Sequence, residues 1–255
     1  MYDHTKLVSK RVWRELLRRL PSSKQKKRGR PRVKKESIVN GILQVLVNGV
    51  AWKKIAFCGC GYASCWRYFK ELQRRGKLKL IYQILAKEKA SIEEGAIDTT
   101  TAVSFRFARM VGWDGKHKIN GTKISLFTDK YGLPADVEID KASKHDGKFV
   151  RDHIKNTSGR RRRLISMDMI YSNLELRRDM RKKGIKINVQ TRKDYYTRKI
   201  GPKFKFDKEK YKVRFLVERT NAWLKNFLRI RIRREHPPAM FKAFVYLALI
   251  IILIR

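Results

Sequence analysis

Three acidic residues, Asp98, Asp168 and Glu218, occupy positions from which they could form a metal site. Asp98 and Asp168 each follow a short apolar stretch, GAI and LISM, and Glu218 lies among large apolar residues in YKVRFLVERTNAWLKNFLRI, residues 211–230. Functional side chains of open α/β sheets gather where strands end. Carboxylate oxygens suit Mg²⁺, which completes its octahedron with water and phosphate oxygens. We therefore expect these acids to bind Mg²⁺, with Mn²⁺ as a substitute.

Such a site would act on phosphodiesters. Two ions about 3.5 to 4 Å apart would activate the attacking oxygen and stabilise the leaving oxygen of an in-line displacement. With 23 acidic residues against 63 basic ones, carboxylates kept together need a cation or a strong basic shell. The simpler interpretation, that each aspartate only begins a turn, is acceptable for one of them but less so for two.

The segment around Glu218 has the two-sided pattern of a helix. At about 100° per residue, Glu218 shares an arc of roughly 60° with four basic or aromatic residues. These are Tyr211, Arg214, Lys225 and Arg229. They could form a solvated face with an ordinary Arg214–Glu218 pair, or they could hold DNA beside the acids. Trp223 is expected toward the apolar side of this helix.

The net charge of +40 indicates a polyanionic partner. Nucleic acid fits best, because each neutralised phosphate releases counterions, and an acidic membrane surface is the lesser option. The apolar run at 244–254 is shorter than the roughly 20 residues that a bilayer needs, so a buried helix or strand is expected there. The N-terminus lacks the apolar region of a secretory signal, and we expect a cytoplasmic protein located with the nucleoid.

The N-terminal part of the chain is expected to be helical. Residues 6–20 have helical spacing of apolar positions. The arm at 24–35, KQKKRGRPRVKK, has Gly29 and Pro31 and cannot form regular structure. Its Arg30 and Arg32 could enter a minor groove, or the arm could be a flexible basic linker.

Two amphipathic segments joined by a glycine-bearing turn follow the arm. The pattern from residue 37 to 76 outlines a helix-turn-helix, whose second helix would enter the major groove. Arg67 is expected to face DNA from that helix, together with Ser64, Tyr68 and Lys70, while Trp66, Phe69 and Leu72 pack inward. A plain helical bundle is the alternative.

The three cysteines lie in one short stretch, FCGCGYASC. An odd number argues against a disulfide framework. The spacing of Cys58, Cys60 and Cys65 fits no common zinc finger and no histidine is near, so small buried thiols are favoured over zinc.

From residue 91 the pattern changes to strands and helices. Strands are expected at 95–105, at 122–140 as a hairpin turning at DKYG, at 161–169 and at 186–193. Helices are expected at 147–156 and 172–184, the latter with a capping box from Ser172 and Glu175, before the helix at 211–230. This order predicts an α/β domain with a mixed sheet at 91–255, preceded by an all-helical DNA-binding domain at 1–90.

The spacing of Tyr211, Arg214, Glu218 and Lys225 resembles the tyrosine-arginine-glutamate-lysine signature. With Asp98 in AIDTTT and Asp168 in ISMDMIYSN, the chain resembles the DDE transposases of prokaryotic insertion sequences. GRPR, NGILQVLVNGVAW, GTKISLFTDKYGLP and the His145-Asp146 pair resemble other parts of that family, so the resemblance covers roughly residues 5–254. The chain departs from the usual pattern at Met169 and Ile170, which follow the second acid.

The resemblance implies a ribonuclease-H-like catalytic domain in which Asp98, Asp168 and Glu218 bind divalent metal. It also implies cleavage at transposon ends, joining of 3′-hydroxyls to target DNA, and a homodimer on paired terminal inverted repeats. Two alternatives remain at this point: a catalytically decayed DNA-binding protein, and a ribonuclease-H-like nuclease without strand transfer.

Overall fold

A computed structural model describes residues 7–22, 31–56, 58–105, 109–190 and 205–255. The chain forms two compact units. The first comprises Met1–Ile84, Val103–Arg109 and Leu224–Arg255, and the second comprises Leu85–Ala102 and Met110–Trp223. These units differ from a simple division at residue 90, because the C-terminal residues from Leu224 onward group with the N-terminal helices.

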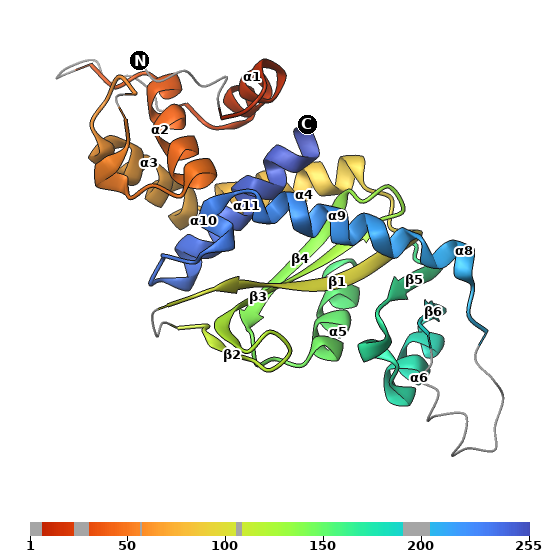
Figure 1. Cartoon of the computed structure of the whole chain (residues 1–255). Coiled ribbons are helices and arrows are strands. Elements are labelled where there is room, and N and C mark those ends of the chain that lie inside the picture. Colours follow the sequence, from red (N-terminus) through yellow and green to blue (C-terminus); the bar gives the residue numbers. More distant parts are fainter. Residues whose placement is uncertain (1–6, 23–30, 57, 106–108, 191–204) are drawn as a thin grey trace. The chain divides into compact units, whose positions relative to one another are not determined.

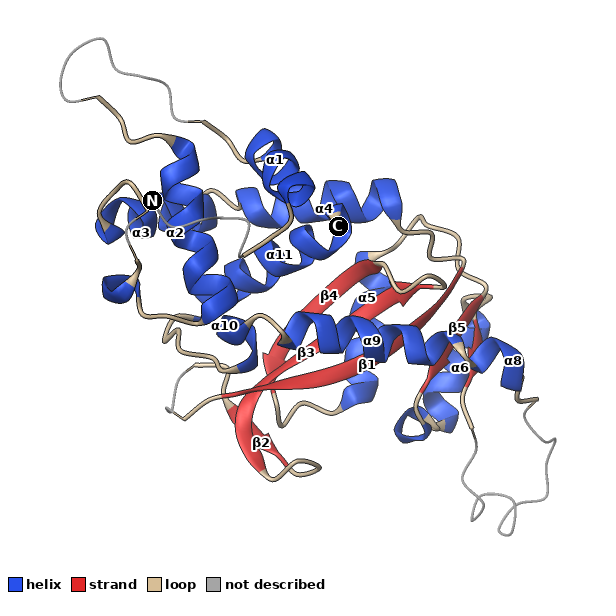
Figure 2. Cartoon of the chain, turned by 45° about the horizontal axis from the view of Figure 1, so that its top comes forward, coloured by secondary structure: helices blue, strands red, loops and turns tan. Residues whose placement is uncertain are grey.

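The second unit is built on a mixed sheet of six strands (Figures 1 and 2). In chain order they are β1 (Glu94–Val103), β2 (Gly112–Asp114), β3 (Ile119–Asp129), β4 (Pro134–Lys141), β5 (Leu164–Met167) and β6 (Lys186–Asn188). The spatial order is β2-β3-β1-β5-β6, and β4 pairs with β3. The β3–β4 hairpin is antiparallel, whereas β1, β5 and β6 run parallel. The mixed α/β sheet predicted from the sequence is confirmed.

Helices lie on both sides of this sheet. Figure 2 shows α9 (Val213–Lys225) running across one side, with α5 (Asp146–Asn156) and α6 (Leu174–Lys182) behind the strands. The core between the sheet and α5 and α6 includes Phe127, Val150, Ile165 and Met180. The turn η3 (Met169–Tyr171) follows β5 directly.

A glycine lets α9 approach the β3–β4 turn closely. Gly132 has a φ of 87°, and a Cβ added there would lie 3.2 Å from the backbone oxygen of Leu216. Thr220 Oγ1 donates a hydrogen bond of 2.7 Å to the Gly132 carbonyl. The turn therefore fixes the position of α9 within the second unit.

Some predicted boundaries were wrong. The strand expected at 161–169 begins only at Leu164. The helix α6 is capped by Asn173, whose side chain accepts from the backbone N–H of Glu175 and Leu176, so the capping box from Ser172 does not form. The strand β6 covers only Lys186–Asn188, and residues 191–193 of its predicted range lie outside the described residues.

The single helix expected at 211–230 is divided into three. These are α8 (Lys208–Tyr211), α9 and α10 (Leu228–Arg231), and Phe227 has the extended backbone of an N-cap between the last two. Trp223 is half-buried, and Arg219 stacks over its ring at 4.8 Å. The expectation that Trp223 lies in the core was therefore wrong, because the buried side of α9 is formed by Val217, Thr220 and Leu224.

The first unit consists of helices. They include α1 (Lys10–Arg19), α2 (Lys35–Asn48), the short η2 (Trp52–Lys54), α3 (Tyr62–Arg74) and α11 (Pro238–Ile254), while α4 (Lys77–Lys89) begins in it. Helix α11 contains the apolar run at 244–254, which is buried as predicted. Among the described residues, no helix has the length and apolar character needed to cross a membrane.

The inward face of α3 differs from the prediction at one position. Cys65, Phe69 and Leu72 are buried at helical spacing, and Phe69 stacks on Phe244 with ring centroids 4.2 Å apart. Trp66 lies one residue round from this stripe and is 38% exposed, with Lys70 4.8 Å from its ring centre. Its expected inward packing was therefore wrong.

Candidate active site

Asp98 and Asp168 occupy equivalent places on neighbouring parallel strands. The register of β1 and β5 pairs Ala96 with Ser166 and Ile97 with Met167, and each acid is the next residue along its strand. Asp168 directly follows the end of β5 at Met167, as predicted, but Asp98 lies within β1, which continues to Val103. Asp98 thus marks the end of the β1–β5 pairing rather than the end of a strand.

Asp98 is held from the other side by α9. Asn221 Nδ2 donates a hydrogen bond of 2.9 Å to Asp98 Oδ2. Burial raises the pKa of the Asp98 carboxyl, and the nearby charge of Glu218 adds to this, although a backbone N–H, Arg214 and Asn221 act in the opposite direction. The positive charge and hydrogen bonds around Asp98 therefore do not fully compensate the burial of its ionised carboxylate.

Arg214 connects the second and third acids. Its Nη2 lies 2.8 Å from Glu218 Oε1 and 3.7 Å from Asp168 Oδ2. Burial alone would lower the pKa of Arg214, but the combined effect of Asp168, Tyr211, Glu218 and Asp98 raises it. The guanidinium therefore offsets part of the negative charge of Asp168 and Glu218 and supplies part of the basic shell expected around the acids.

Tyr211 completes this group from the end of α8. Arg214 lies over its ring, with Cζ 5.7 Å from the ring centre, and Phe206 meets the same ring edge-on at 4.9 Å. Burial raises the pKa of the Tyr211 hydroxyl. Tyr211 and Arg214 therefore lie near Glu218, but Tyr211 belongs to α8 and not to one continuous helix with Glu218 as predicted.

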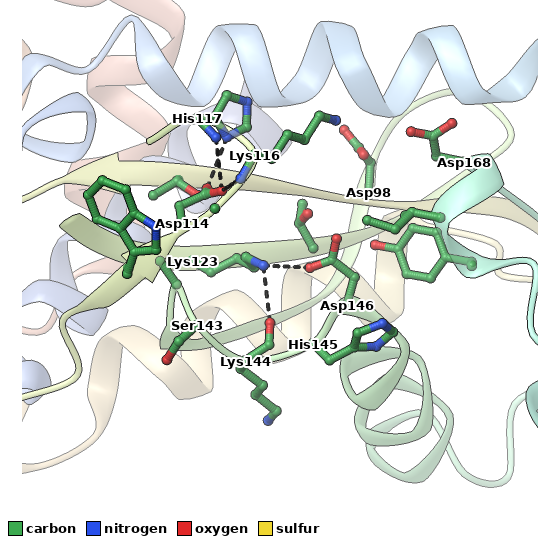
Figure 3. A pocket seen from close by; sticks show the side chains of 17 residues that line it. Asp98, Asp114, Lys116, His117, Lys123, Ser143, Lys144, His145, Asp146 and Asp168 are labelled. Carbon is green, nitrogen blue, oxygen red and sulfur yellow. Dashed lines mark hydrogen bonds and ion pairs between the residues drawn. The ribbon is translucent and has the colours of Figure 1, made fainter. Parts of the chain in front are cut away.

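A pocket of about 240 Å³ begins at the two aspartates (Figure 3). Figure 3 shows Asp98 and Asp168 on one side of it, Asp114 and His117 on the other, and the Lys123–Asp146 pair between them. Lys123 Nζ lies 2.7 Å from Asp146 Oδ1 and also donates to the Lys144 carbonyl at 3.1 Å. Both side chains are largely buried, at 11% exposure each.

Asp114 organises the far wall of the pocket. Its Oδ2 accepts from Thr101 Oγ1 at 2.5 Å and contacts His117 Nδ1 at 2.9 Å. Its Oδ1 accepts from the backbone N–H groups of Lys116 and His117. Burial would raise the pKa of Asp114, but these hydrogen bonds outweigh it and lower the pKa to about 2.

The donor atoms around Asp98 suit a hard divalent cation. Three carboxylates supply oxygen ligands of the type that Mg²⁺ and Mn²⁺ prefer. Asn221 Oδ1 and Arg214 Nε are buried with no hydrogen-bond partner among the described residues. Within the described ranges, the group of three converging metal-ligand side chains is a cysteine cluster, and the three acids do not form such a group. Because Arg214 Nη2 lies close to both Glu218 and Asp168, its guanidinium would compete with an ion bound to these acids.

The other predicted DNA contacts lie in the first unit or outside the described part. Arg30 is outside the described residues, whereas Arg32 and Arg67 are exposed. Lys225 is the exposed last residue of α9. Arg229 does not share the face of Glu218, because α10 is a separate helix. Its side chain is 7% exposed and pairs with Glu235 at 2.5 Å, so the expected outward position of Arg229 was wrong.

Sequence reasoning missed three polar residues of this site. Asn221 lies three residues after Glu218, a helical spacing that could have placed it on the same face. Lys123 and Asp146 pair across 23 positions, and nothing in the local sequence indicated their contact.

Comparisons with known proteins identify the family of the chain. Residues 89–254 match the family described as transposase DDE domain. Residues 8–82 match a domain family assigned to transposases of the IS4/5 family. No curated protein matches the chain. Among solved structures, a cryo-EM structure of the piggyBac transposase synaptic complex with hairpin DNA is similar with a TM-score of 0.58 at 9% identity, covering 98% of this chain and 71% of that one.

Proposed function

Because the chain belongs to the DDE transposase family, an enzyme family that cleaves and transfers DNA, we propose that Asp98, Asp168 and Glu218 are its catalytic acids. The observation that carries this proposal is the alignment of Asp98 and Asp168 at the end of the β1–β5 pairing. Arg214 adds the third acid, since it pairs with Glu218 and lies 3.7 Å from Asp168.

We propose that the acids hold two Mg²⁺ ions, or Mn²⁺ in their place. When bound, the ions would supply Lewis acidity to the attacking and leaving oxygens of a phosphodiester. Asn221 orients the Asp98 carboxylate through its hydrogen bond. Arg214 offsets part of the negative charge of Asp168 and Glu218 in the absence of metal, and it could contact a phosphate when DNA is bound.

The DNA substrate is assigned from charge and from the related fold. The similar piggyBac structure is a synaptic complex with hairpin DNA, and the net charge of +40 suits a polyanion. We propose that terminal inverted repeats and target DNA are the ligands, that Tyr211 and Lys225 contact DNA near the acids, and that Arg30, Arg32 and Arg67 contact it from the N-terminal helical domain. A homodimer on paired ends is part of the same proposal.

End cleavage tests the catalytic assignment. Duplexes carrying the inverted repeats that flank the gene are incubated with full-length protein and Mg²⁺ or Mn²⁺ under single-turnover conditions. Asp98→Ala, Asp168→Ala and Glu218→Ala should each abolish cleavage while gel shifts show retained DNA binding. A variant that cleaves at the native rate removes that residue from the catalytic set.

Product analysis separates the remaining alternatives. Transfer of the cleaved 3′-hydroxyl to a second duplex is expected of a transposase. Cleavage without joining would favour a nuclease of the same fold, and binding without cleavage by the native chain would favour a decayed copy.

A further inference from the structure

Three cysteines of the first unit bring their sulfur atoms together. Cys58 and Cys60 lie in the loop before α3, and Cys65 lies in the first turn of that helix. The Sγ of Cys60 is 3.7 Å from that of Cys58 and 3.5 Å from that of Cys65. All three sulfurs lie within 4.8 Å of one another. They form the cysteine cluster, and it includes every cysteine of the chain.

The backbone makes room for this cluster at two glycines. Gly59 has a φ of 89°, in the left-handed region, which lets the chain reverse between Cys58 and Cys60. Gly41 lies on the face of α2 opposite the sulfurs. A Cβ at Gly41 would lie 2.6 Å from Cys65 Sγ and 3.2 Å from Cys58 Sγ, so a side chain at this position would fill the space that the sulfurs occupy.

Two of the three sulfur separations fit ligands of one ion, and the third pair of sulfurs lies within 4.8 Å. With Zn–S bonds of about 2.3 Å, tetrahedral geometry places two sulfur ligands about 3.8 Å apart. The two measured distances, 3.7 and 3.5 Å, are close to this value. They are much longer than the roughly 2.05 Å of a disulfide bond. Without an ion the cluster contains only weak hydrogen-bonding groups.

We propose that Cys58, Cys60 and Cys65 bind one Zn²⁺ ion as thiolates. Three Zn–S bonds form, the three S–H protons pass to solvent, and the site carries a net charge of −1 within a strongly basic chain. Cys60 is half-exposed, so water can occupy the fourth position beside it. Sequence spacing argued against zinc because it matched no common finger, but spacing does not report the three-dimensional approach of the sulfurs.

The ion would have a structural role in the first unit. It would join the loop at 58–60 to the first turn of α3, beside Gly41 of α2. Arg67 lies on the exposed side of α3, two residues after Cys65. Zinc binding is therefore expected to stabilise the helix that carries this predicted DNA contact. The site does not depend on the catalytic acids, so its failure would leave the transposase assignment unchanged.

Metal titration of the full-length protein tests the proposal. The chain is reduced, stripped of metal with a chelator and titrated with Zn²⁺ in competition with a chromophoric chelator. We expect one tightly bound Zn²⁺ per chain, protection of the partly exposed Cys60 thiol from a thiol reagent, and a higher melting temperature. Co²⁺ in place of Zn²⁺ should produce a thiolate-to-metal charge-transfer absorption.

Cys60→Ser provides the decisive variant, because its side chain is partly exposed and its replacement spares the core. Outer-shell partners of zinc are worth about 10- to 100-fold in affinity, so loss of a direct thiolate should weaken binding by at least about 100-fold. Ser64→Ala, in the first turn of α3 beside Cys65, is the control and should bind zinc normally. Zinc binding by the native chain that leaves the Cys60 thiol reactive, unchanged affinity in Cys60→Ser, or no binding at all would overturn the proposal.

Discussion

Arg214 and Glu218 form an ion pair of 2.8 Å one helical turn apart on α9, and the same guanidinium lies 3.7 Å from Asp168. The Arg214 guanidinium thus interacts with two proposed metal ligands, and this has two consequences. It stabilises the acids without metal, and it competes with a divalent cation for them.

Arg214→Gln should therefore increase the dependence of stability on metal. In EDTA at pH 7 we expect a loss of about 1 kcal/mol, the upper end for partly exposed pairs. Mn²⁺ should then raise the melting temperature more in the variant than in the native chain. Lys212→Gln is the control, since its pair with Glu209 is exposed at both ends and should contribute little. An equal response to Mn²⁺ in both proteins would show that Arg214 does not compete with the ion.

Asp98→Asn should stabilise the metal-free protein. Burial raises the pKa of Asp98 above its ordinary 3.8, so the folded state holds this proton more tightly than the unfolded state. The contribution to stability is present below pH 3.8 and is lost as pH rises through the raised pKa. At pH 7 in EDTA the asparagine variant avoids that loss and keeps an acceptor for Asn221.

The same variant should lose its response to metal. Melting curves between pH 4 and 8, with and without Mn²⁺, test both effects. A variant less stable than the native chain at every pH, or one that Mn²⁺ stabilises equally, would contradict the account of Asp98.

Asp114→Asn should destabilise the far wall of the pocket. The carboxylate accepts four hydrogen bonds, and a hydrogen bond to a charged group contributes about 1.5 to 3 kcal/mol. Its lowered pKa of about 2 means that the contribution is present above pH 3.8 and is lost as pH falls toward 2. The difference in unfolding free energy between native and variant should shrink over that window. A constant difference from pH 7 to 2 would mean that ionisation of Asp114 is not the cause.

Arg229→Met should lower the free energy of unfolding, and its effect should not be limited to weaker DNA binding. Arg229 and Glu235 are 7% and 5% exposed, and Arg229 also donates to the Val50 carbonyl. Removing one partner leaves a buried unpaired charge, which costs about 3 to 5 kcal/mol. The double variant Arg229→Met with Glu235→Leu should recover most of this stability. Native stability with weakened DNA binding in the single variant would restore the role first predicted for Arg229.

Arg67→Ala should weaken DNA binding through a lost phosphate contact. The slope of log affinity against log salt should fall in magnitude by about 1. Arg74→Ala, on the same helix but paired with Glu71, removes the same charge and should leave the slope unchanged. Equal effects of both variants on a random duplex would indicate a nonspecific basic surface.

Local sequence patterns determined much of this protein. Alternation and apolar runs located the strands other than β2 and the hairpin at DKYG, and the apolar run at 244–254 was recognised as buried but not as a helix. The acids could be selected because carboxylates are scarce in a chain with 63 basic residues. Their spacing with Tyr211, Arg214 and Lys225 was enough to identify the family.

The tertiary structure decided how distant residues meet. Parallel pairing of β1 with β5 aligned Asp98 with Asp168, and packing of α9 on the β3–β4 turn brought Asn221 to Asp98. The helix expected at 211–230 is interrupted at Phe227, and Arg229 on the following short helix pairs with Glu235. Periodicity could not predict this ion pair, because it describes one segment at a time. For the same physical reason, only the folded backbone, with Gly41 and Gly59 in place, could bring three cysteine sulfurs into one cluster.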